Sequence, residues 1–166
     1  MHLESAFSII SKLIEYLSRH QWVLIIIVLF LVLLAMINSR RVNTGYFVLY
    51  LALTVYITLI NRTPNHSRMA WLQVFLTYQY FFSDAYLRRK ILNNILLFIP
   101  LGAILFRLRS DRTTLFIIIS ISAAIELLQY ITRRGLFETD DLISNGLGGL
   151  IGVAACMLWM HICNKK

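Results

Sequence analysis

The stretch TTLFIIISISAAIELLQYIT at residues 113–132 decides the fold class, because it is a helix-length apolar run interrupted by one acid, Glu126. A hydrocarbon core about 30 Å thick needs about 20 helical residues to cross it. Further apolar runs of comparable character lie at 22–37, 46–60, 93–106 and 142–163. We therefore predict an all-α integral membrane helical bundle of five transmembrane helices, with no strand pattern and no internal repeat.

The composition agrees with a membrane protein. Apolar residues make up 58% of the 166 residues and charged residues 14%, against roughly a quarter charged in soluble domains. This composition excludes a disordered chain and argues against a soluble globular one. The net charge of +8 comes from basic residues that flank the apolar runs, which favours membrane lipids rather than nucleic acid as partners.

The segments outside the predicted spans have features of the membrane interface. Residues 1–19 place apolar residues on one helical face and polar residues on the other, which predicts an amphipathic helix on the membrane surface. They lack the small-residue cleavage site of a signal peptide. The aromatic stretch 69–83 predicts an interfacial or re-entrant helix within the connection 61–90. We expect Pro100 to kink the short third span. Residues 1–40 form an N-terminal region of amphipathic helix and extra span, and 41–166 a four-helix core.

Five spans place the two termini on opposite sides of the membrane. Basic residues are densest in the short segments 38–45, 107–113 and 164–166, which favours this side as cytoplasmic. We therefore expect the N-terminus outside and the C-terminus inside.

Polar residues gather at the opposite, outer side. Glu126 lies within its apolar helix and shares a helical face with Gln129 and Arg133. An ionisable residue inside a span is by default a functional-site hypothesis. We expect Arg133 or Arg134 to pair with Glu126. The alternative is a structural network that fastens the outer ends of three helices.

The last apolar run has one polar and small face. Asp141, Asn145, Gly148 and Gly152 recur at helical spacing, and the two glycines form a GxxxG pattern that favours close helix packing over any catalytic role. The predicted topology brings this face to the side of the membrane that also holds Arg62, Asn93, Asn94, Arg134, Glu138 and Asp140.

No recognisable catalytic motif accompanies this polar cluster. The sequence contains no Ser-His-Asp or Cys-His arrangement, so the candidate catalytic residues are Glu126, Asp140 and Asp141 without an assigned reaction. Asp140 and Asp141 are also candidate oxygen ligands for a divalent cation. No other cofactor is predicted.

The order of these motifs resembles the VanZ family of bacterial membrane proteins. The resemblance rests on NILLFIPLG at 94–102, on IELLQY at 125–130, and on the series of Arg134, Gly135, Phe137, Asp140, Asp141, Asn145 and Gly149. NRTP at 61–64 and FLTY at 75–78 are also similar to family members, and the likeness covers roughly 46–155. The residues matched to the family pattern are Arg62, Asn94, Glu126, Gln129, Arg134, Asp140, Asp141 and Asn145.

The resemblance implies a multi-pass bacterial cell-membrane protein with a site at the outer face. It also implies an association with teicoplanin resistance or cell-envelope physiology. The expected binding residues are Arg62, Asn94, Gln129, Arg134 and Asn145, and the expected ligands are lipid-linked cell-wall precursors or a lipoglycopeptide. The arginines suit a carboxylate or phosphate.

Two other functions stay open from the sequence. One is a membrane enzyme acting on a lipid-linked cell-wall or surface-polymer intermediate, in which Glu126 serves as general acid or base. The other is a small transporter, which the few spans and the lack of inverted repeats disfavour unless a homo-oligomer forms the pathway.

Overall fold

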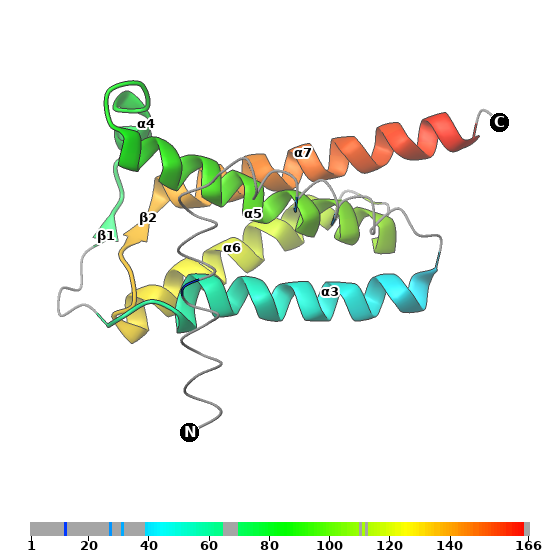
Figure 1. Ribbon diagram of the computed structural model, residues 1–166, viewed down its shortest axis with the longest axis horizontal. Helices are drawn as coiled ribbons and strands as arrows, with labels where there is room; N and C mark the ends of the chain where they lie inside the picture. The colour runs from blue at the N-terminus through cyan, green and yellow to red at the C-terminus, as the bar shows by residue number, and fades with distance from the viewer. Residues whose placement is uncertain are drawn as a thin grey trace.

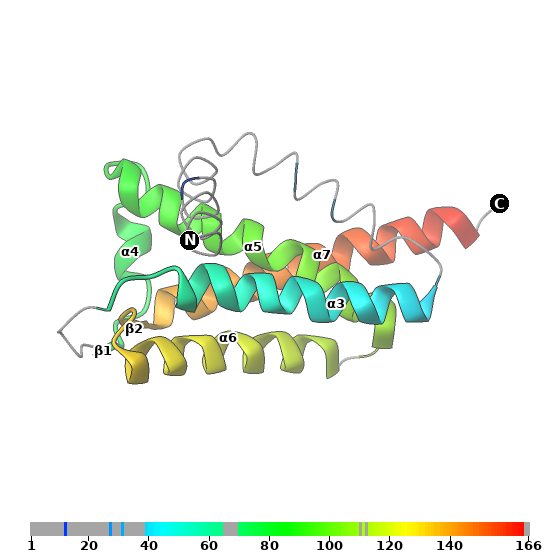
Figure 2. The same cartoon turned by 60° about the horizontal axis from the view of Figure 1, so that its bottom comes forward.

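The computed structural model describes residues 12, 27, 31, 39–64, 70–109, 111 and 113–164. Its long helices lie side by side along one direction (Figures 1 and 2). The elements are α3 (Arg40–Val55), η1 (Tyr56–Ile60), β1 (Ala70–Trp71), α4 (Leu76–Gln79), α5 (Ala85–Arg109), α6 (Thr113–Thr132), β2 (Phe137–Glu138) and α7 (Thr139–Asn164).

Among the described residues, four helical segments are long and apolar enough to cross a membrane: Arg40–Ile60, Ala85–Arg109, Thr113–Thr132 and Thr139–Cys163. The all-α membrane bundle is thus confirmed. The predicted first span at 22–37 and the amphipathic helix at 1–19 lie outside the described residues, apart from the isolated positions 12, 27 and 31.

Helix α5 begins earlier than the predicted third span. The carboxylate of Asp84 accepts hydrogen bonds from the backbone N–H groups of Tyr86 (2.7 Å) and Leu87 (3.1 Å), which caps the helix at its start. The helix then continues through Pro100 to Arg109. The prediction of a short third span is therefore wrong, because the charged residues 88–90 belong to the helix rather than to a loop.

The stretch 69–83 also differs from its prediction. Only Leu76–Gln79 is helical, and Ala70–Trp71 pairs in parallel with Phe137–Glu138, the segment between α6 and α7. The expectation of no strand thus fails at two short places. Phe75 adopts φ 64°, in the left-handed region that few non-glycine residues occupy, so the chain turns sharply just before α4.

Helices α5 and α7 form the most extensive contact of the bundle, and glycine is the reason. A Cβ added at Gly148 would lie 2.2 Å from the carbonyl oxygen of Ile95, and one at Gly152 would lie 1.9 Å from that of Ile99. Backbone therefore packs on backbone, as the GxxxG pattern predicts.

The apolar core lies beside this contact. Phe98, Leu101 and Ile104 of α5 are fully buried, together with Ile118 of α6 and Cys156 of α7. Helix α3 is fastened to α5 by the hydroxyl of Tyr50, which donates to the carbonyl oxygen of Leu97 at 2.8 Å.

Alternate helices run in opposite directions, and this places the polar residues. The end of α3–η1, the start of α5, the end of α6 and the start of α7 meet at one end of the bundle (Figure 1). We call it the Arg62 end. The start of α3, the end of α5 and the start of α6 lie at the other end, which we call the Arg40 end.

Candidate functional site

Arg134 holds the Arg62 end together through backbone carbonyl groups. Its guanidinium donates to the carbonyl oxygens of Ile60 (2.7 Å) and Arg62 (2.9 Å), and more weakly to that of Leu59 (3.5 Å). Carbonyl groups at a helix end otherwise lack partners, so Arg134 closes the C-terminal end of η1. The predicted pairing of Glu126 with Arg134 is therefore wrong.

Arg133, the other predicted partner of Glu126, does not reach inward either. It lies at the end of α6 with φ 58° and is exposed. The left-handed conformation ends the helix at Thr132 and turns the chain toward β2, which carries the side chain of Arg133 away from the buried face of α6.

Gln129 positions Arg62. Its side-chain NH₂ donates to the carbonyl oxygen of Thr58 at 3.0 Å, and its carbonyl oxygen accepts a long hydrogen bond from Arg62 at 3.5 Å. Gly135 leaves room for this pair, since a Cβ there would lie 2.9 Å from the Gln129 oxygen and 3.0 Å from an Arg62 nitrogen. Gln129 thus orients the guanidinium of Arg62 through one long hydrogen bond. Most of the guanidinium N–H groups can still donate to other acceptors.

Glu126 is a buried carboxylate surrounded by charges. It is 2% exposed and accepts a hydrogen bond from the backbone N–H of Glu138 at 3.2 Å. The charges that act on it belong to Asp141, Arg62 and Lys90. Its surroundings are therefore set by two cations and a second acid, and not by the arginines that follow it in the chain.

Lys90 joins α5 to the start of α7. Its ammonium pairs with Glu138 and, at 3.2 Å, with Asp141. Asp141 is 5% exposed at its side chain and Lys90 18%. A charge this deeply buried needs a partner, and Lys90 supplies one to two carboxylates at once.

Asp140 has a separate task from its neighbour Asp141. Its two carboxylate oxygens accept the backbone N–H groups of Phe75 (2.6 Å) and Thr77 (2.7 Å), and the residue is 3% exposed. These are charge-assisted hydrogen bonds, which are stronger than neutral ones. Asp140 therefore holds the turn before α4, and Asp140 and Asp141 are not brought to one shared site.

Tyr78 and Ser144 reinforce the contact made by Asp140. The Tyr78 hydroxyl and the Ser144 hydroxyl share a hydrogen bond of 2.7 Å, and Ser144 donates to the carbonyl oxygen of Asp140 at 2.8 Å. Burial raises the pKa of the Tyr78 phenol, and the neighbouring Asp140 and Asp141 raise it further, while the hydrogen bond with Ser144 lowers it. Tyr78 therefore stays a neutral hydroxyl at physiological pH.

Asn145 extends the polar surface one helical turn deeper. Its NH₂ group donates to the Ser122 hydroxyl of α6 at 2.8 Å. Its buried side-chain oxygen has no hydrogen-bond partner. Ser122 lies one turn before Glu126, and Asn145 one turn after Asp141, so α6 and α7 present matched polar layers to each other.

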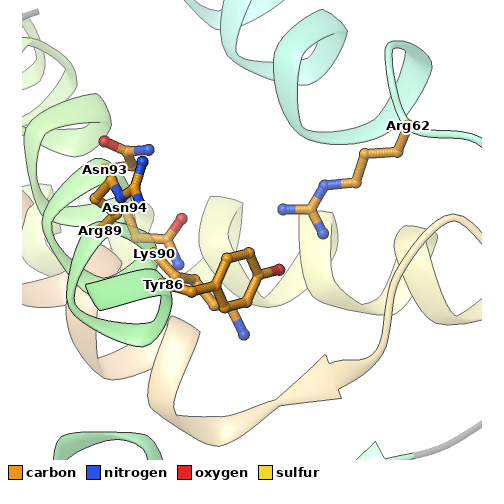
Figure 3. Close-up of a pocket in the computed structure, with 6 residues that line it drawn as sticks. All are labelled: Arg62, Tyr86, Arg89, Lys90, Asn93 and Asn94. Atoms are coloured by element: carbon orange, nitrogen blue, oxygen red, sulfur yellow. The ribbon is translucent and has the colours of Figure 1, made fainter. Parts of the chain in front are cut away.

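Two neighbouring cavities open at the Arg62 end. The smaller, of about 270 Å³, is lined by Arg62, Tyr86, Arg89, Lys90, Asn93 and Asn94. Figure 3 shows Arg62 reaching from the end of η1 toward the side chains of α5. The larger, of about 680 Å³, shares three of these residues and is lined by Asn61, Arg62, Thr63, Pro64, Tyr86, Lys90, Arg134, Gly135, Leu136 and Glu138.

The smaller cavity, which we call the donor cavity, suits an anion. Its six lining side chains are three cations, two amides and a phenol, and every one of them can donate a hydrogen bond. Guanidinium and ammonium groups bind carboxylate and phosphate oxygens strongly. The arrangement can therefore bind a carboxylate or phosphate group between η1 and α5.

Sequence reasoning named Arg62 and Asn94 but missed Tyr86, Arg89 and Lys90. Positions 86, 89, 90, 93 and 94 recur at the spacing of one helical face. This pattern becomes visible only when the helix begins at Ala85, whereas the predicted span begins at residue 93.

The described residues do not form the cation site predicted at Asp140 and Asp141. In the part of the chain that the structure describes, no group of three or more His, Cys, Asp or Glu side chains could hold a metal ion. Glu126, Glu138 and Asp141 lie at the Arg62 end with Lys90, whose positive charge acts on all three.

Comparison with known proteins identifies the family. The VanZ/LLP1 family profile matches residues 21–160, which is most of the 166-residue chain. Comparisons with curated proteins and with solved structures find no match. The matched region includes three of the apolar helices in full, residues 139–160 of the fourth, and every residue named for the two cavities at the Arg62 end. This chain is therefore a VanZ-like membrane protein that belongs to the VanZ/LLP1 family.

Proposed function

We propose that this VanZ-like protein acts in cell-envelope physiology, including resistance to the glycopeptide teicoplanin, by binding an anionic group of a membrane-anchored ligand in the donor cavity. The ligand is a lipid-linked cell-wall precursor or the lipoglycopeptide itself. In this proposal the Arg62 end faces the outside of the cell. The dense basic residues of the short segments at the Arg40 end support that orientation.

The observation that carries the proposal is the chemistry of the donor cavity. Arg62, Asn94 and the other four lining side chains are all hydrogen-bond donors, and among the residues that the structure describes no carboxylate lines the cavity. The acids nearby are engaged, because Glu138 and Asp141 pair with Lys90 and Asp140 accepts two backbone amides. An anion entering the cavity would therefore meet the side-chain donors of Arg62, Arg89 and the two asparagines, while the ammonium of Lys90 neutralises the two nearest acids.

A sensitive bacterium that expresses the protein tests this proposal. We expect the wild type to raise the teicoplanin concentration needed to stop growth, and Arg62→Gln to return it to the value of the empty vector at matched membrane abundance. Arg133→Gln is the control, since Arg133 is exposed at the same end and lines neither cavity. Equal resistance from wild type and Arg62→Gln would contradict the proposal.

A second variant separates charge from folding. Asn94→Asp keeps the size of the side chain but replaces a donor with a carboxylate in the cavity, which repels an anion. We expect it to lose resistance while remaining folded and abundant. Resistance that survives Asn94→Asp would place the binding of the anion elsewhere.

One observation favours the enzyme alternative. Glu126 is a buried carboxyl group on which the charges of Asp141, Arg62 and Lys90 act, and groups with such surroundings are candidate general acids or bases. An enzyme would change the lipid-linked intermediates of the membrane. Mass spectrometry of membrane lipids from cells with wild type or Glu126→Gln distinguishes the two: altered lipids in wild type alone support the enzyme, and unchanged lipids with intact resistance support binding.

A further inference from the structure

A third cavity lies at the Arg40 end, on the opposite side of the bundle from the candidate site. It has a volume of about 620 Å³ and opens between α3, α5 and the start of α6. Its lining residues are Arg40, Thr44, Phe47, Leu105, Leu108, Arg109, Asp111 and Ile117. None of them lines the donor cavity, so whatever this third cavity binds is independent of the proposed function.

The lining of this cavity is divided into two chemically different parts. Arg40, Thr44, Arg109 and Asp111 are polar and belong to the ends of their helices or the turn between them. The apolar lining residues are Phe47 of α3, Leu105 and Leu108 of α5, and Ile117 of α6. We call the cavity the amphipathic cavity. The six described residues that line the donor cavity, by contrast, include no Leu, Ile or Val.

The charge of the polar part is positive. Asp111 is engaged by the backbone N–H of Thr113 at 3.0 Å and by the Thr113 hydroxyl, with Arg109 at 4.0 Å. These hydrogen bonds hold the pKa of Asp111 below its usual value, so it is ionised and serves to cap α6. Against this one carboxylate stand two arginines from different helices, Arg40 and Arg109, whose guanidinium groups are suited to phosphate.

We propose that the amphipathic cavity binds an anionic phospholipid from the membrane leaflet at the Arg40 end. Arg40 and Arg109 contact the phosphodiester, and one acyl chain lies along Phe47, Leu105 and Ile117. Basic pockets between transmembrane helices are the sites at which anionic lipid head groups bind. The occupant is a bilayer lipid rather than a free anion, because half of the lining is apolar and extends from the polar part toward the buried core.

Thermal unfolding of the detergent-solubilised full-length chain with added lipid tests this proposal. Phosphatidylglycerol should raise the unfolding temperature, whereas phosphatidylcholine with the same acyl chains should not. In the double variant Arg40→Gln/Arg109→Gln we expect the apparent affinity for phosphatidylglycerol to fall roughly thirtyfold, since each basic residue near an anionic headgroup contributes about fivefold.

The matched control is Arg41→Gln/Arg133→Gln. It removes the same amount of charge from two exposed arginines that do not line the cavity, and it should keep the affinity of the wild type. An equal loss in both double variants would overturn the proposal, because it would reduce the effect to overall charge. Equal stabilisation by phosphatidylethanolamine would overturn the selectivity for an anionic lipid.

A third variant probes the apolar part and covers the case in which the arginine variant does not fold. Ile117→Trp fills the cavity from α6 without changing any charge, and Ile117 is only half-buried, so the larger ring can be accommodated. We expect it to weaken the phosphatidylglycerol effect at least about tenfold, as loss of part of an acyl-chain contact predicts. An unchanged effect, or equal stabilisation by inorganic phosphate, would overturn the role of the acyl chain.

Discussion

The two ends of the bundle handle charge in opposite ways. At the Arg62 end, Lys90, Asp140, Asp141 and Arg134 are each committed to specific partners on other elements. At the Arg40 end, Arg40 and Arg41 are exposed, and the ion pair between Arg109 and Asp111 is long and lies at the surface. The amino-acid types are similar, so burial and partner geometry create the difference.

This difference teaches where polar residues stabilise the fold. Exposed ion pairs contribute little to stability, whereas removing one member of a buried pair leaves an uncompensated charge. The Arg62 end therefore depends on its individual partners, whereas Arg40 and Arg41 at the Arg40 end are exposed and should contribute little to stability. Three substitutions, from the largest expected effect to the smallest, can break or sharpen this contrast.

Lys90→Met should have the largest effect. It leaves Asp141 and Glu138 buried without their cation, which we expect to lower the free energy of unfolding by about 3 kcal/mol, at the low end for buried pairs because Lys90 keeps some exposure. Chemical unfolding in mixed micelles measures this change in the free energy of unfolding. Arg41→Met at the other end is the control and should stay within about 0.5 kcal/mol of wild type; similar losses in both variants would remove the contrast.

Asp140→Ala should have the next largest effect. It removes the acceptor of the backbone N–H groups of Phe75 and Thr77, and we expect a loss of about 2 kcal/mol in the free energy of unfolding. Because Asp140 holds the turn before α4, limited proteolysis should also cut near residue 75 sooner than in wild type. Asp140→Asn keeps one acceptor oxygen and should be intermediate, so identical behaviour of the two variants would refute this role for the carboxylate.

Asp111→Asn at the Arg40 end should have the smallest effect, and a defined pH dependence. The pKa of Asp111 is lowered in the folded protein from its ordinary 3.8. Its contribution to stability is therefore fully present above that value and is lost as the pH falls through the lowered pKa. Unfolding temperatures from pH 7 to pH 3 should show a small difference between wild type and Asp111→Asn that disappears only at the acid end. A difference that grows toward low pH would have the wrong sign.

The sequence predicted the helices best where a long apolar run contained at most one charged residue. The span predicted at 113–132 has the bounds of α6, Thr113–Thr132, and the span at 142–163 lies within α7, Thr139–Asn164. The start of α5 was missed because Arg88, Arg89 and Lys90 look like a loop until Asp84 is seen to cap the helix. Charged residues do not mark the end of such a helix, because a helix that projects beyond the hydrocarbon core can carry charged side chains there.

The composition of the candidate site was easier to predict than its pairing. The structure brings Arg62, Glu126, Gln129 and Arg134 to one end, as the sequence indicated. The partners of these side chains could not be predicted from the sequence. Nearness along the chain favoured Arg134 as the partner of Glu126, but Arg134 donates to the backbone carbonyl groups of Leu59, Ile60 and Arg62. The turn at Phe75 has no sequence signal of its own, since φ 64° is held there by a distant carboxylate.

The bridge between Lys90 and the residues that follow α6 has a consequence for biogenesis. Lys90 belongs to α5, while Glu138 and Asp141 are synthesised only after α6, so the ammonium has no counter-charge at the moment when α5 enters the bilayer. A lysine in that state extends toward water and headgroups. The Arg62 end is thus completed only when α7 is in place, because both carboxylates that pair with Lys90 follow α6 in the chain.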